Sequence, residues 1–439
     1  MPLVYTGPPS MKSAKPYNAA LFVLVAVNIL NFYDRNVLGA LTEPIRKEFA
    51  LTDTQVGLIG SSFIWLYAII GVPLGKIADS RSRRKLLAGG MVVWTALTAV
   101  AALASSYTML LLSRLGFAVG EAAVAPAATS WIGDLFPPAQ RSRPLALFML
   151  GVPIGGAASY FLSGPIAQAF GWRVAMAVAA APALVLLPWL LRLPEPVRST
   201  AVAHGKFGKP ASIRTILKIP TIWWIIASGA LLNFNMYAIS VFLPAFLSRI
   251  HHVSLARSGI ATGLVYAVGG VAGGLGAGWI GDRVFHRRKD GRMLCAAAFA
   301  AIGAPLAYFG ISGQDLYTAL LLIALTYAAL NAYYGFVYSS IQDIVPAGAV
   351  GTAMAIYFMA MYLCGASFGP LLTGKVSDMM ARRAADAAGS LQITEAFKAV
   401  GLQQAMLMIP VFSLLLAVVL YGGSHTIVKD MRRREAASK

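Results

Sequence analysis

The sequence predicts an all-α polytopic membrane protein whose twelve transmembrane helices form two pseudo-symmetric six-helix bundles. Three observations support this fold class: the chain is strongly apolar, long apolar runs recur along it, and motifs of its first half return in its second half. Of its 439 residues, 58% are hydrophobic and 12% are charged, whereas soluble domains average about 45–50% and about 25%. A composition of this kind exposes apolar surface to lipid rather than to water.

Twelve apolar runs are each long enough, at about 20 residues, to cross a hydrocarbon layer about 30 Å thick. They cover residues 17–40, 56–79, 86–105, 108–133, 143–169, 172–192, 221–248, 257–281, 293–312, 316–342, 350–378 and 400–427. The first run lacks a cleavage site of small residues, so we expect it to remain as the first helix. The predicted six-helix domains are residues 1–192 and 221–439.

Residues 193–220 between the domains are polar, basic and interrupted by proline and glycine, which predicts a linker with a short surface helix near 211–218. Twelve spans place both termini on one side of the membrane. The tails and loops of that side hold 24 of the 36 Lys and Arg, and the opposite side holds nine. This excess marks the cytoplasmic face, so we expect a plasma (inner) membrane protein with both termini inside.

The net charge of +19 would point to nucleic acid in a soluble protein. The basic residues of this chain are spread over short loops beside the bilayer, where anionic membrane lipids are their natural partners, so no nucleic-acid partner is expected. Cys295 and Cys364 fall inside predicted helices, which argues against a disulfide framework. The sequence has no nucleophile constellation, so we expect no enzymatic activity. It suggests no metal, no cofactor and no partner protein, and we expect the protein to be a monomer.

Several motifs of the first half return in the second half at nearly constant offsets of 203 and 209 residues. They close the second and fourth helices and, again, the eighth and tenth. The matching segments are Gly75–Asp79 with Gly278–Asp282, and Asp134–Pro137 with Asp343–Pro346. Two glycines of the fifth helix, Gly155 and Gly164, likewise match Gly365 and Gly374 of the eleventh. Two repeated halves with a site between them are the layout of carriers that rock in alternating access.

The segment Gly75-x-x-x-Asp79 with its trailing arginines resembles the cytoplasmic signature of the major facilitator superfamily, although Ser80 and Ser82 stand where a basic residue and a glycine are usual. The resemblance covers the whole chain and implies the major facilitator fold. It also implies that charged clusters latch the two halves together on the cytoplasmic side. The residues concerned are Gly75, Asp79, Arg83, Arg84, Asp134, Gly278, Asp282, Arg283 and Asp343. The alternative is that these charges only fix the topology.

Two segments resemble the Spinster family of that superfamily more specifically. One is Asn31-Phe-Tyr-Asp34-Arg35 in the first helix, and the other is Gly120-Glu121-Ala-Ala, with Pro126 and Asp134-Leu-Phe-Pro downstream. The resemblance implies a lysophospholipid- or sphingolipid-like cargo.

Four ionisable residues lie well inside the predicted helices, all in the first half: Asp34, Arg35, Arg114 and Glu121. Each would cost about 2.5–3.5 kcal/mol at mid-bilayer, so they should face the interior and pair with one another. Burial favours a neutral carboxyl and a nearby guanidinium favours the charged form, so a change of partner can load and release a proton. We expect Glu121 and Asp34 to titrate, with the two arginines as partners or as anchors for an anionic headgroup. The alternative is a static network that ties the first helix to the fourth.

The second half offers amide and aromatic groups instead of charges. Candidates for substrate contact, together with Arg35, Arg114, Glu121 and Asn31 of the first half, are Asn233, Tyr237, Asn331, Tyr334, Tyr338, Tyr357 and Met361, and also Tyr266 and Tyr362. A site charged on one wall and aromatic on the other suits an amphipathic substrate. The alternative is ordinary packing, since Asn often joins helices in membranes.

The leading hypothesis is a proton-coupled secondary active transporter that moves an amphipathic, lysolipid- or sphingolipid-like substrate by alternating access. A second hypothesis is a proton-coupled carrier of small organic anions held by Arg35 or Arg114. A hypothesis from another class is a membrane sensor or scaffold that uses a carrier fold without transporting.

Overall fold

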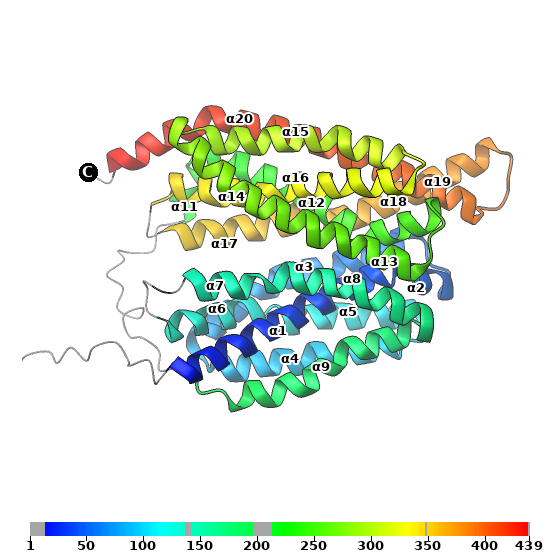
Figure 1. Ribbon diagram of the computed structural model, residues 1–439, viewed down its shortest axis with the longest axis horizontal. Coiled ribbons are helices and arrows are strands. Elements are labelled where there is room, and N and C mark those ends of the chain that lie inside the picture. Colours follow the sequence, from blue (N-terminus) through cyan, green and yellow to red (C-terminus); the bar gives the residue numbers. More distant parts are fainter. Residues whose placement is uncertain (1–13, 137–139, 141, 196–212, 347–348, 438–439) are drawn as a thin grey trace, which may run out of the picture.

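The computed structural model describes residues 14–136, 140, 142–195, 213–346 and 349–437. All elements of these ranges are helical, and twelve stretches are long and apolar enough to cross a membrane. Figure 1 shows two bundles that lie side by side, one made of the first half of the chain and the other of the second half. The predicted fold class is therefore confirmed. The exact limits of the two domains stay a prediction.

The first bundle contains six membrane-spanning stretches. Its continuous helices are α1 (Ala14–Ala40), α3 (Asp53–Ser80), α4 (Arg83–Ala102) and α9 (Trp172–Arg192), and the short α2 (Thr42–Glu48) joins α1 to α3. The other two stretches are interrupted, giving α5 (Tyr107–Glu121) with α6 (Val124–Leu135), and α7 (Ser142–Met149) with α8 (Gly151–Phe170). Each interruption lies three or four residues before a proline, Pro126 or Pro153, which cannot donate to the carbonyl one turn back.

The second bundle follows the short helix α11 (Ile213–Leu217), which lies where a surface helix was predicted; residues 211–212 are outside the described ranges. Its continuous helices are α12 (Pro220–Ile250), α15 (Gly291–Ser312) and α16 (Leu316–Ile344). The eighth stretch comprises α13 (Leu255–Leu264), the π-helical turn η3 (Val265–Gly269) and α14 (Gly270–Arg287). The eleventh comprises α17 (Val350–Met361), a second π-helical turn η5 (Tyr362–Ala366) and α18 (Phe368–Ala387), and the twelfth comprises α19 (Glu395–Met406) and α20 (Met408–Ala437).

Two of these helices are longer than predicted. α18 reaches Ala387 instead of ending near residue 378, and the twelfth stretch begins at Glu395 instead of near residue 400. Together α18 and α19 form a hairpin that projects beyond the bundle (Figure 1). Hydropathy marks only the part of a helix that lies in lipid, and the charged residues Arg382, Arg383 and Asp386 end the apolar run without ending the helix.

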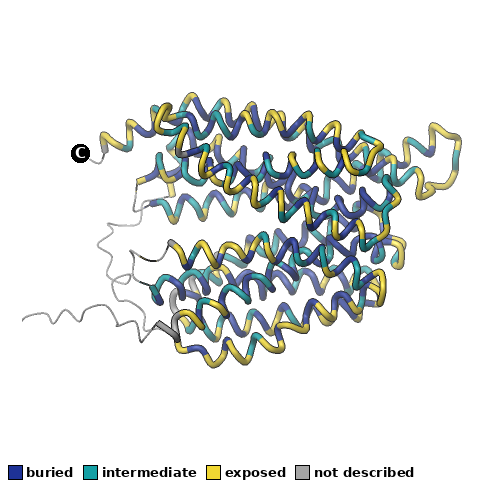
Figure 2. The backbone as a smooth tube through the Cα atoms, viewed as in Figure 1, coloured by how far each residue is buried: buried dark blue, intermediate teal, exposed yellow. Residues whose placement is uncertain are grey.

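Burial follows the inner faces of both bundles, and the exposed residues follow their outer faces (Figure 2). Large apolar side chains such as Phe170, Leu184 and Leu275 are among the exposed ones. In lipid such side chains meet an apolar solvent, and close packing of small residues rather than apolar burial holds the helices together. Gly90 of α4 and Gly120 of α5 show this packing, because a Cβ on either would meet the carbonyl of the other.

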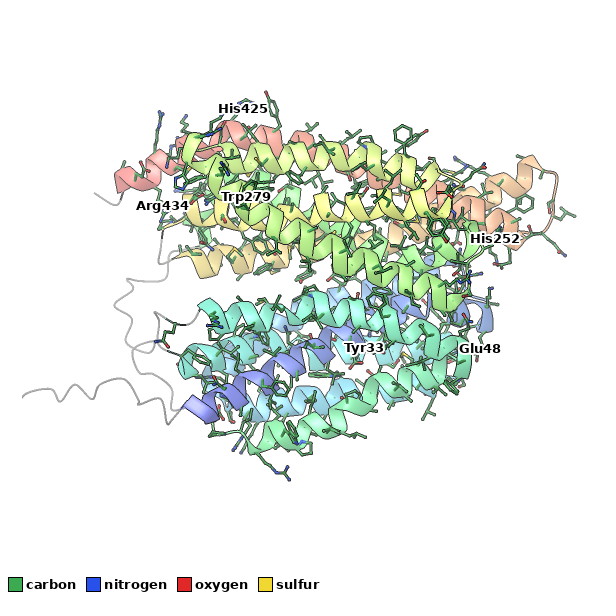
Figure 3. All side chains as sticks on the ribbon, in the orientation of Figure 1. Tyr33, Glu48, His252, Trp279, His425 and Arg434 are labelled. Atoms are coloured by element: carbon green, nitrogen blue, oxygen red, sulfur yellow. The ribbon has the colours of Figure 1, made fainter. Side chains whose placement is uncertain are left out.

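The two ends of the molecule differ. One end, called the linker end below, carries α11 and the end of α20 with Arg434, and the opposite end, called the distal end, carries α2, Glu48, His252 and the α18–α19 hairpin (Figures 1 and 3). The halves touch chiefly through α3 with α18, α8 with α13, and α1 with α12. The hydrogen bonds and ion pairs that join the halves among the described residues all lie toward the distal end.

Candidate functional site

Two of the four charges predicted inside the membrane form an ion pair between α1 and α5. Arg35 Nε donates to Glu121 Oε2 at 3.0 Å, and Arg35 Nη2 lies 3.0 Å from the same oxygen. The side chains are 7% and 0% exposed. Because an unpaired charge is costly at this depth, each group stabilises the charged form of the other.

Arg114 has a different set of partners from those expected. Its Nη1 donates to the backbone oxygen of Asp34 at 3.2 Å, and its Nη2 donates to the backbone oxygen of Arg35 at 2.6 Å. These carbonyls lie inside α1 and can accept a second bond because each has two lone pairs. Arg114 therefore ties α5 to the backbone of α1 and forms no hydrogen bond with a carboxylate in this arrangement.

Asp34 is fully buried, and neither of its carboxylate oxygens has a hydrogen-bond partner. The groups that face it are Glu121, Arg114 and the indole of Trp94 on α4. The Trp94 Nε1 also lacks an acceptor at hydrogen-bonding geometry. A buried carboxylate without a hydrogen-bond donor would cost several kcal/mol in its charged form, so the Arg114 guanidinium is the group near Asp34 that can offset such a charge.

Aromatic rings of α1, α3 and α5 surround the two guanidinium groups. The Arg35 guanidinium carbon lies 4.5 Å from the ring centre of Tyr67 and 5.3 Å from that of Phe63. The Arg114 guanidinium carbon lies 5.0 Å from the same Phe63 ring and 4.3 Å from that of Phe117. Phe63 is thus in contact with both cations, which favours their charged state through its ring face. Phe63 and Tyr67 were not predicted from the sequence, although their spacing of four residues places them on one face of α3.

In the second half, five of the predicted residues form one cluster. Asn233 on α12 donates to Met361 Sδ at 3.3 Å and accepts from the Tyr334 hydroxyl at 3.2 Å. The ring of Tyr338 lies 5.5 Å from that of Tyr334 and 5.8 Å from that of Tyr357. Tyr357 and Met361 are buried, as packing residues are, whereas the rings of Tyr334 and Tyr338 are half-buried.

Tyr237 of α12 lies close to Arg35. It contacts Tyr362, with ring centres 6.3 Å apart, and Tyr362 in turn lies 5.8 Å from Tyr67 of the first half. These three half-buried tyrosines join the two halves beside the Arg35 guanidinium. Tyr362 begins the π-helical turn η5, a distortion that is frequent at functional sites.

Three predicted residues take other positions. Asn331 Nδ2 donates to the backbone oxygen of Gly270 at 2.7 Å and so joins α16 to α14. Asn31 is buried, and its Nδ2 has no hydrogen-bond partner. Tyr266 contacts Tyr160 of the first half, with ring centres 5.0 Å apart, and Tyr327 at 4.7 Å.

The motifs at the linker end pair within their own halves. Arg83 binds the carboxylate of Asp134 and donates to the backbone oxygen of Ser130 at 3.3 Å. In the second half, Arg292 binds Asp343 at 2.7 Å. Each of these bonds connects neighbouring helices of one half.

Two further arginines of these motifs contact residues of their own half. Arg84 donates to the backbone oxygen of Leu193 at 3.1 Å, and Arg283 lies over the ring of Trp279. A Cβ on Gly75 or Gly278 would meet no atom within 4 Å. The side chains of Asp79 and Asp282 fall outside the described residues.

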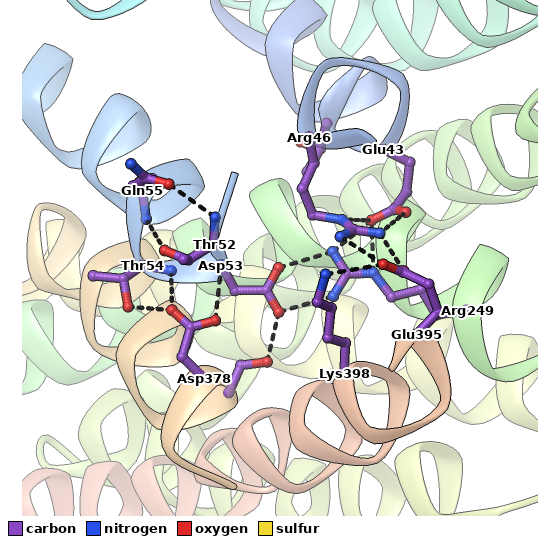
Figure 4. Close-up of polar contacts among 12 residues, drawn as sticks. Glu43, Arg46, Thr52, Asp53, Thr54, Gln55, Arg249, Asp378, Glu395 and Lys398 are labelled. Atoms are coloured by element: carbon purple, nitrogen blue, oxygen red, sulfur yellow. Dashed lines mark hydrogen bonds and ion pairs between the residues drawn. The ribbon is translucent and has the colours of Figure 1, made fainter. Parts of the chain in front are cut away.

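A charged cluster at the distal end, not predicted from the sequence, joins the two halves (Figure 4). Arg249 of α12 binds both oxygens of Asp53, each at 2.8 Å, and donates through Nε to Glu43 at 2.6 Å. The hydroxyl of Ser377 on α18 donates to the same Asp53 carboxylate at 2.6 Å. The three charged side chains are buried. Arg249 belongs to the second half and its two acidic partners to the first, so these ion pairs hold the halves together.

Arg46 of α2 extends this cluster to the projecting hairpin. It binds Glu43 at 3.1 Å and the Glu395 carboxylate of α19 at 2.6 Å, and Lys398 also binds Glu395 at 3.0 Å. Burial lowers the pKa of Arg46, but the bonds to Glu395 and Glu43 outweigh burial and leave the pKa above its usual value. Arg46 therefore remains charged and fastens the hairpin of the second half to α2 of the first.

Comparison with known proteins adds a family context to this geometry. The model of the Major Facilitator Superfamily matches residues 24–370. An MFS-type efflux pump of Mycolicibacterium smegmatis is 31% identical over 366 residues, covering 82% of this chain and 85% of the pump. A probable L-galactonate transporter of Escherichia coli is 26% identical, covering 82% of this chain and 83% of the transporter. A bacterial homolog of the human lysosomal transporter Spinster, solved in an inward-facing and unoccupied conformation, superposes with a TM-score of 0.86 at 25% identity, covering 95% of this chain and 99% of that chain.

Proposed function

The chain belongs to the major facilitator superfamily, and from this premise we propose that it is a proton-coupled secondary active transporter that moves an amphipathic, lysolipid- or sphingolipid-like substrate by alternating access. That it is a carrier rather than an enzyme follows from the family and the fold. The predicted resemblance to Spinster is confirmed by a Spinster homolog among the solved structures of the same fold. Proton coupling and the substrate class are our proposal.

One observation carries the coupling: the buried Arg35–Glu121 ion pair lies beside Asp34, a carboxyl group without a hydrogen-bond partner. Protonation of Glu121 would remove the counter-ion of Arg35. The guanidinium could then bind the anionic group of a substrate, and loss of the proton would restore the original pair. Asp34, buried beside this pair without a hydrogen-bond partner, supplies a second proton site in this proposal, and Arg114 holds the backbone of α1 at residues 34 and 35.

The differences between the two ends of the molecule support a proposal for its orientation in the membrane. We propose that the linker end is cytoplasmic, in a plasma (inner) membrane, because the loops of that end carry the excess of Lys and Arg. With this orientation the ion pairs of the distal end close the external side. The described ion pairs of the linker-end motifs, Arg83–Asp134 and Arg292–Asp343, each lie within one half, and we propose that the cytoplasmic latch is released in this state. The likeness to an inward-facing homolog supports the same state.

The substrate class is supported by the two unlike walls of the site. Charged groups come from the first half, and the second half supplies Tyr237, Tyr334, Tyr338 and Tyr362, all half-buried. A lipid with an ionic head and an apolar tail suits both walls. A second candidate is a small organic anion, which is favoured by the position of Arg35 among tyrosine rings and by the likeness to a probable L-galactonate transporter.

Reconstitution into proteoliposomes with an imposed pH gradient tests this proposal. Uptake of a labelled lysophospholipid and of galactonate would be measured together with internal pH, for the native protein and for Glu121→Gln and Asp34→Asn. We expect both variants to lose gradient-driven accumulation, while Glu48→Gln, which changes an exposed carboxylate of the same half, keeps it. Unchanged accumulation in Glu121→Gln and Asp34→Asn would contradict the coupling mechanism. A native protein that moves neither substrate nor protons would favour the sensor or scaffold.

A further inference from the structure

At the distal end, a side chain of each half caps the first turn of a helix in the other half. We infer that these two capping residues, Asp378 and Gln168, position the halves when the distal end closes. Each residue belongs to one half and caps the first turn of a helix in the other half. The inference concerns the closing of the transport path and is independent of what the protein carries. Three observations support it: the capping bonds, their relation by the internal repeat, and a glycine one turn before each capping residue.

The first cap is on α3. A helix begins with N–H groups that have no acceptor within the helix, and in α3 the residue Thr52 covers only that of Gln55. The backbone N–H groups of Asp53 and Thr54 donate instead to the two oxygens of Asp378, at 3.0 and 2.8 Å. The Thr54 hydroxyl donates to the same carboxylate at 2.5 Å (Figure 4). The first turn of α3 is therefore completed by α18 of the other half.

The second cap is on α13. Its preceding residue, Ser254, accepts only from the N–H of Arg257. The N–H of Ala256 donates to Oε1 of Gln168 at 2.9 Å, and Gln168 belongs to α8 of the first half. Here the second half provides the helix and the first half provides the cap, which is the reverse of the arrangement at α3.

The internal repeat relates the two caps. The capped residues Thr54 and Ala256 are 202 positions apart, and the capping residues Gln168 and Asp378 are 210 positions apart. These separations match, within a residue, the offsets of 203 and 209 residues that relate the motifs of the two halves. The caps are therefore one device that is present twice, once in each half.

Glycines allow the helices to approach closely enough for both caps. Gly374 lies four residues before Asp378, and a Cβ there would collide with the backbone of Asp53. Gly164 lies four residues before Gln168, and a Cβ there would collide with the backbone of Leu255 and Gly259. In both cases the glycine brings the end of the partner helix against the backbone, and the side chain one turn later reaches its free N–H groups.

The two caps differ in strength because their chemistry differs. Asp378 makes three bonds and places a negative charge at the positive end of α3, whereas Gln168 makes one neutral bond. The ion pair of Arg249 with Asp53 adds to the Asp378 side and has no counterpart at Gln168 among the described residues. The α3–α18 contact is therefore the stronger one, and opening of the distal end begins between α8 and α13.

Distance measurements by double electron–electron resonance on the full-length protein in lipid nanodiscs test this inference. Cys295 and Cys364 would be replaced by alanine, and spin labels placed at Leu103 and Tyr317, which are 74% and 80% exposed at the distal ends of the first and second halves. We expect Asp378→Asn to lower the ratio of short to long distances by about tenfold or more, as for lost bonds to a charged group. Gln168→Ala should lower it less, by a few-fold.

Two further variants separate capping from a general loss of structure. Asp378→Gln combined with Gln168→Asp keeps an acceptor at both caps, so we expect its short distances to return. Asp386→Asn removes an exposed carboxylate from the same helix and should change nothing. A label pair within the first half, at Leu103 and Phe170, reports whether the fold is intact. The inference is overturned if, with that distance unchanged, Asp378→Asn matches Asp386→Asn, or if the exchanged pair is as open as the single variants.

Discussion

Replacement of Arg249 by glutamine removes the cation that holds two acidic residues of the first half against the second half. In the native arrangement Arg249 binds Asp53 with two bonds of 2.8 Å and Glu43 with one of 2.6 Å. Their side chains are buried, so the substitution leaves Asp53 without a bound cation and with little water around it, while Glu43 keeps its ion pair with Arg46. Glutamine retains most of the side-chain volume but supplies no charge, so the effect measures the ion pairs rather than a cavity.

The size of the effect follows from the burial. Removal of one partner from a buried ion pair costs about 3–5 kcal/mol, because the remaining charge is left uncompensated. Opening of the distal end would admit water to Asp53 and relieve this cost. The ratio of closed to open molecules should therefore fall by about 100-fold to about 4,000-fold, since about 1.4 kcal/mol corresponds to a factor of ten.

Alkylation of a single cysteine at position 241 measures this change. Val241 is half-buried and packs against Gly60 of the other half, so a cysteine there should react faster with a hydrophilic maleimide when the halves separate. The matched control is Arg173→Gln at the same end, because Arg173 and Glu48 form a pair within the first half that is 42% and 40% exposed. Such exposed pairs contribute about 0–1 kcal/mol. Equal reaction rates in Arg249→Gln and Arg173→Gln would refute the role given to the buried cluster.

Two further predictions concern the first half. The bonds from Arg173 and Trp172 hold the pKa of Glu48 below its usual value of 4.5, so the stability they add is present above that value and is lost as the pH falls through the lowered one. Thermal unfolding between pH 3 and 6 should therefore depend less on pH in Glu48→Gln, and an identical pH profile would contradict this assignment. At the crossing of α4 and α5, Gly120→Ala would press a methyl group on the backbone of Gly90 and Trp94 and should destabilise the protein by about 1–3 kcal/mol. Gly133→Ala, which meets no neighbouring atom, should not lower the unfolding temperature, and equal effects of the two would exclude close packing as the cause.

Hydropathy was sufficient to predict the twelve membrane stretches, because apolar length is a property of each segment alone. It could not predict where α18 and α19 end, since those turns lie beyond the apolar runs and hold charged residues. The π-helical turns η3 and η5 could not be predicted from the sequence either. They depend on how a helix is packed by its neighbours rather than on its own residues.

The central charges were predicted only in part. Depth and helical face brought Arg35, Arg114 and Glu121 to one place, and the structure puts them there. The partners of Arg114 could not be read from the sequence, because it binds backbone carbonyls and every residue carries one. The lack of a hydrogen-bond partner for Asp34 likewise depends on which side chains surround it in space, and a sequence motif does not specify this.

The distal cluster was missed for a different reason. Glu43, Asp53 and Arg249 come from separate segments near the ends of predicted helices, where a charged residue is ordinary. The internal repeat held a usable signal, because Gly164 and Gly374 were already matched and a polar residue follows each by four positions. One polar residue near a helix end is nevertheless a weak pattern, because whether it caps another helix depends on which helix packs beside it.

The cap on α3 also has a consequence for how the chain is assembled during synthesis. Thr54 and its acceptor Asp378 are 324 residues apart, so α3 leaves the ribosome long before the helix that completes its first turn. The first bundle can acquire the Arg35–Glu121 pair and its own packing while two N–H groups of α3 still lack their protein acceptor. Insertion of the eleventh stretch then supplies that acceptor. The first turn of an early helix is therefore completed only when one of the last helices has been inserted. A nascent chain that stops before α18 would therefore hold a formed core with an unfinished distal end.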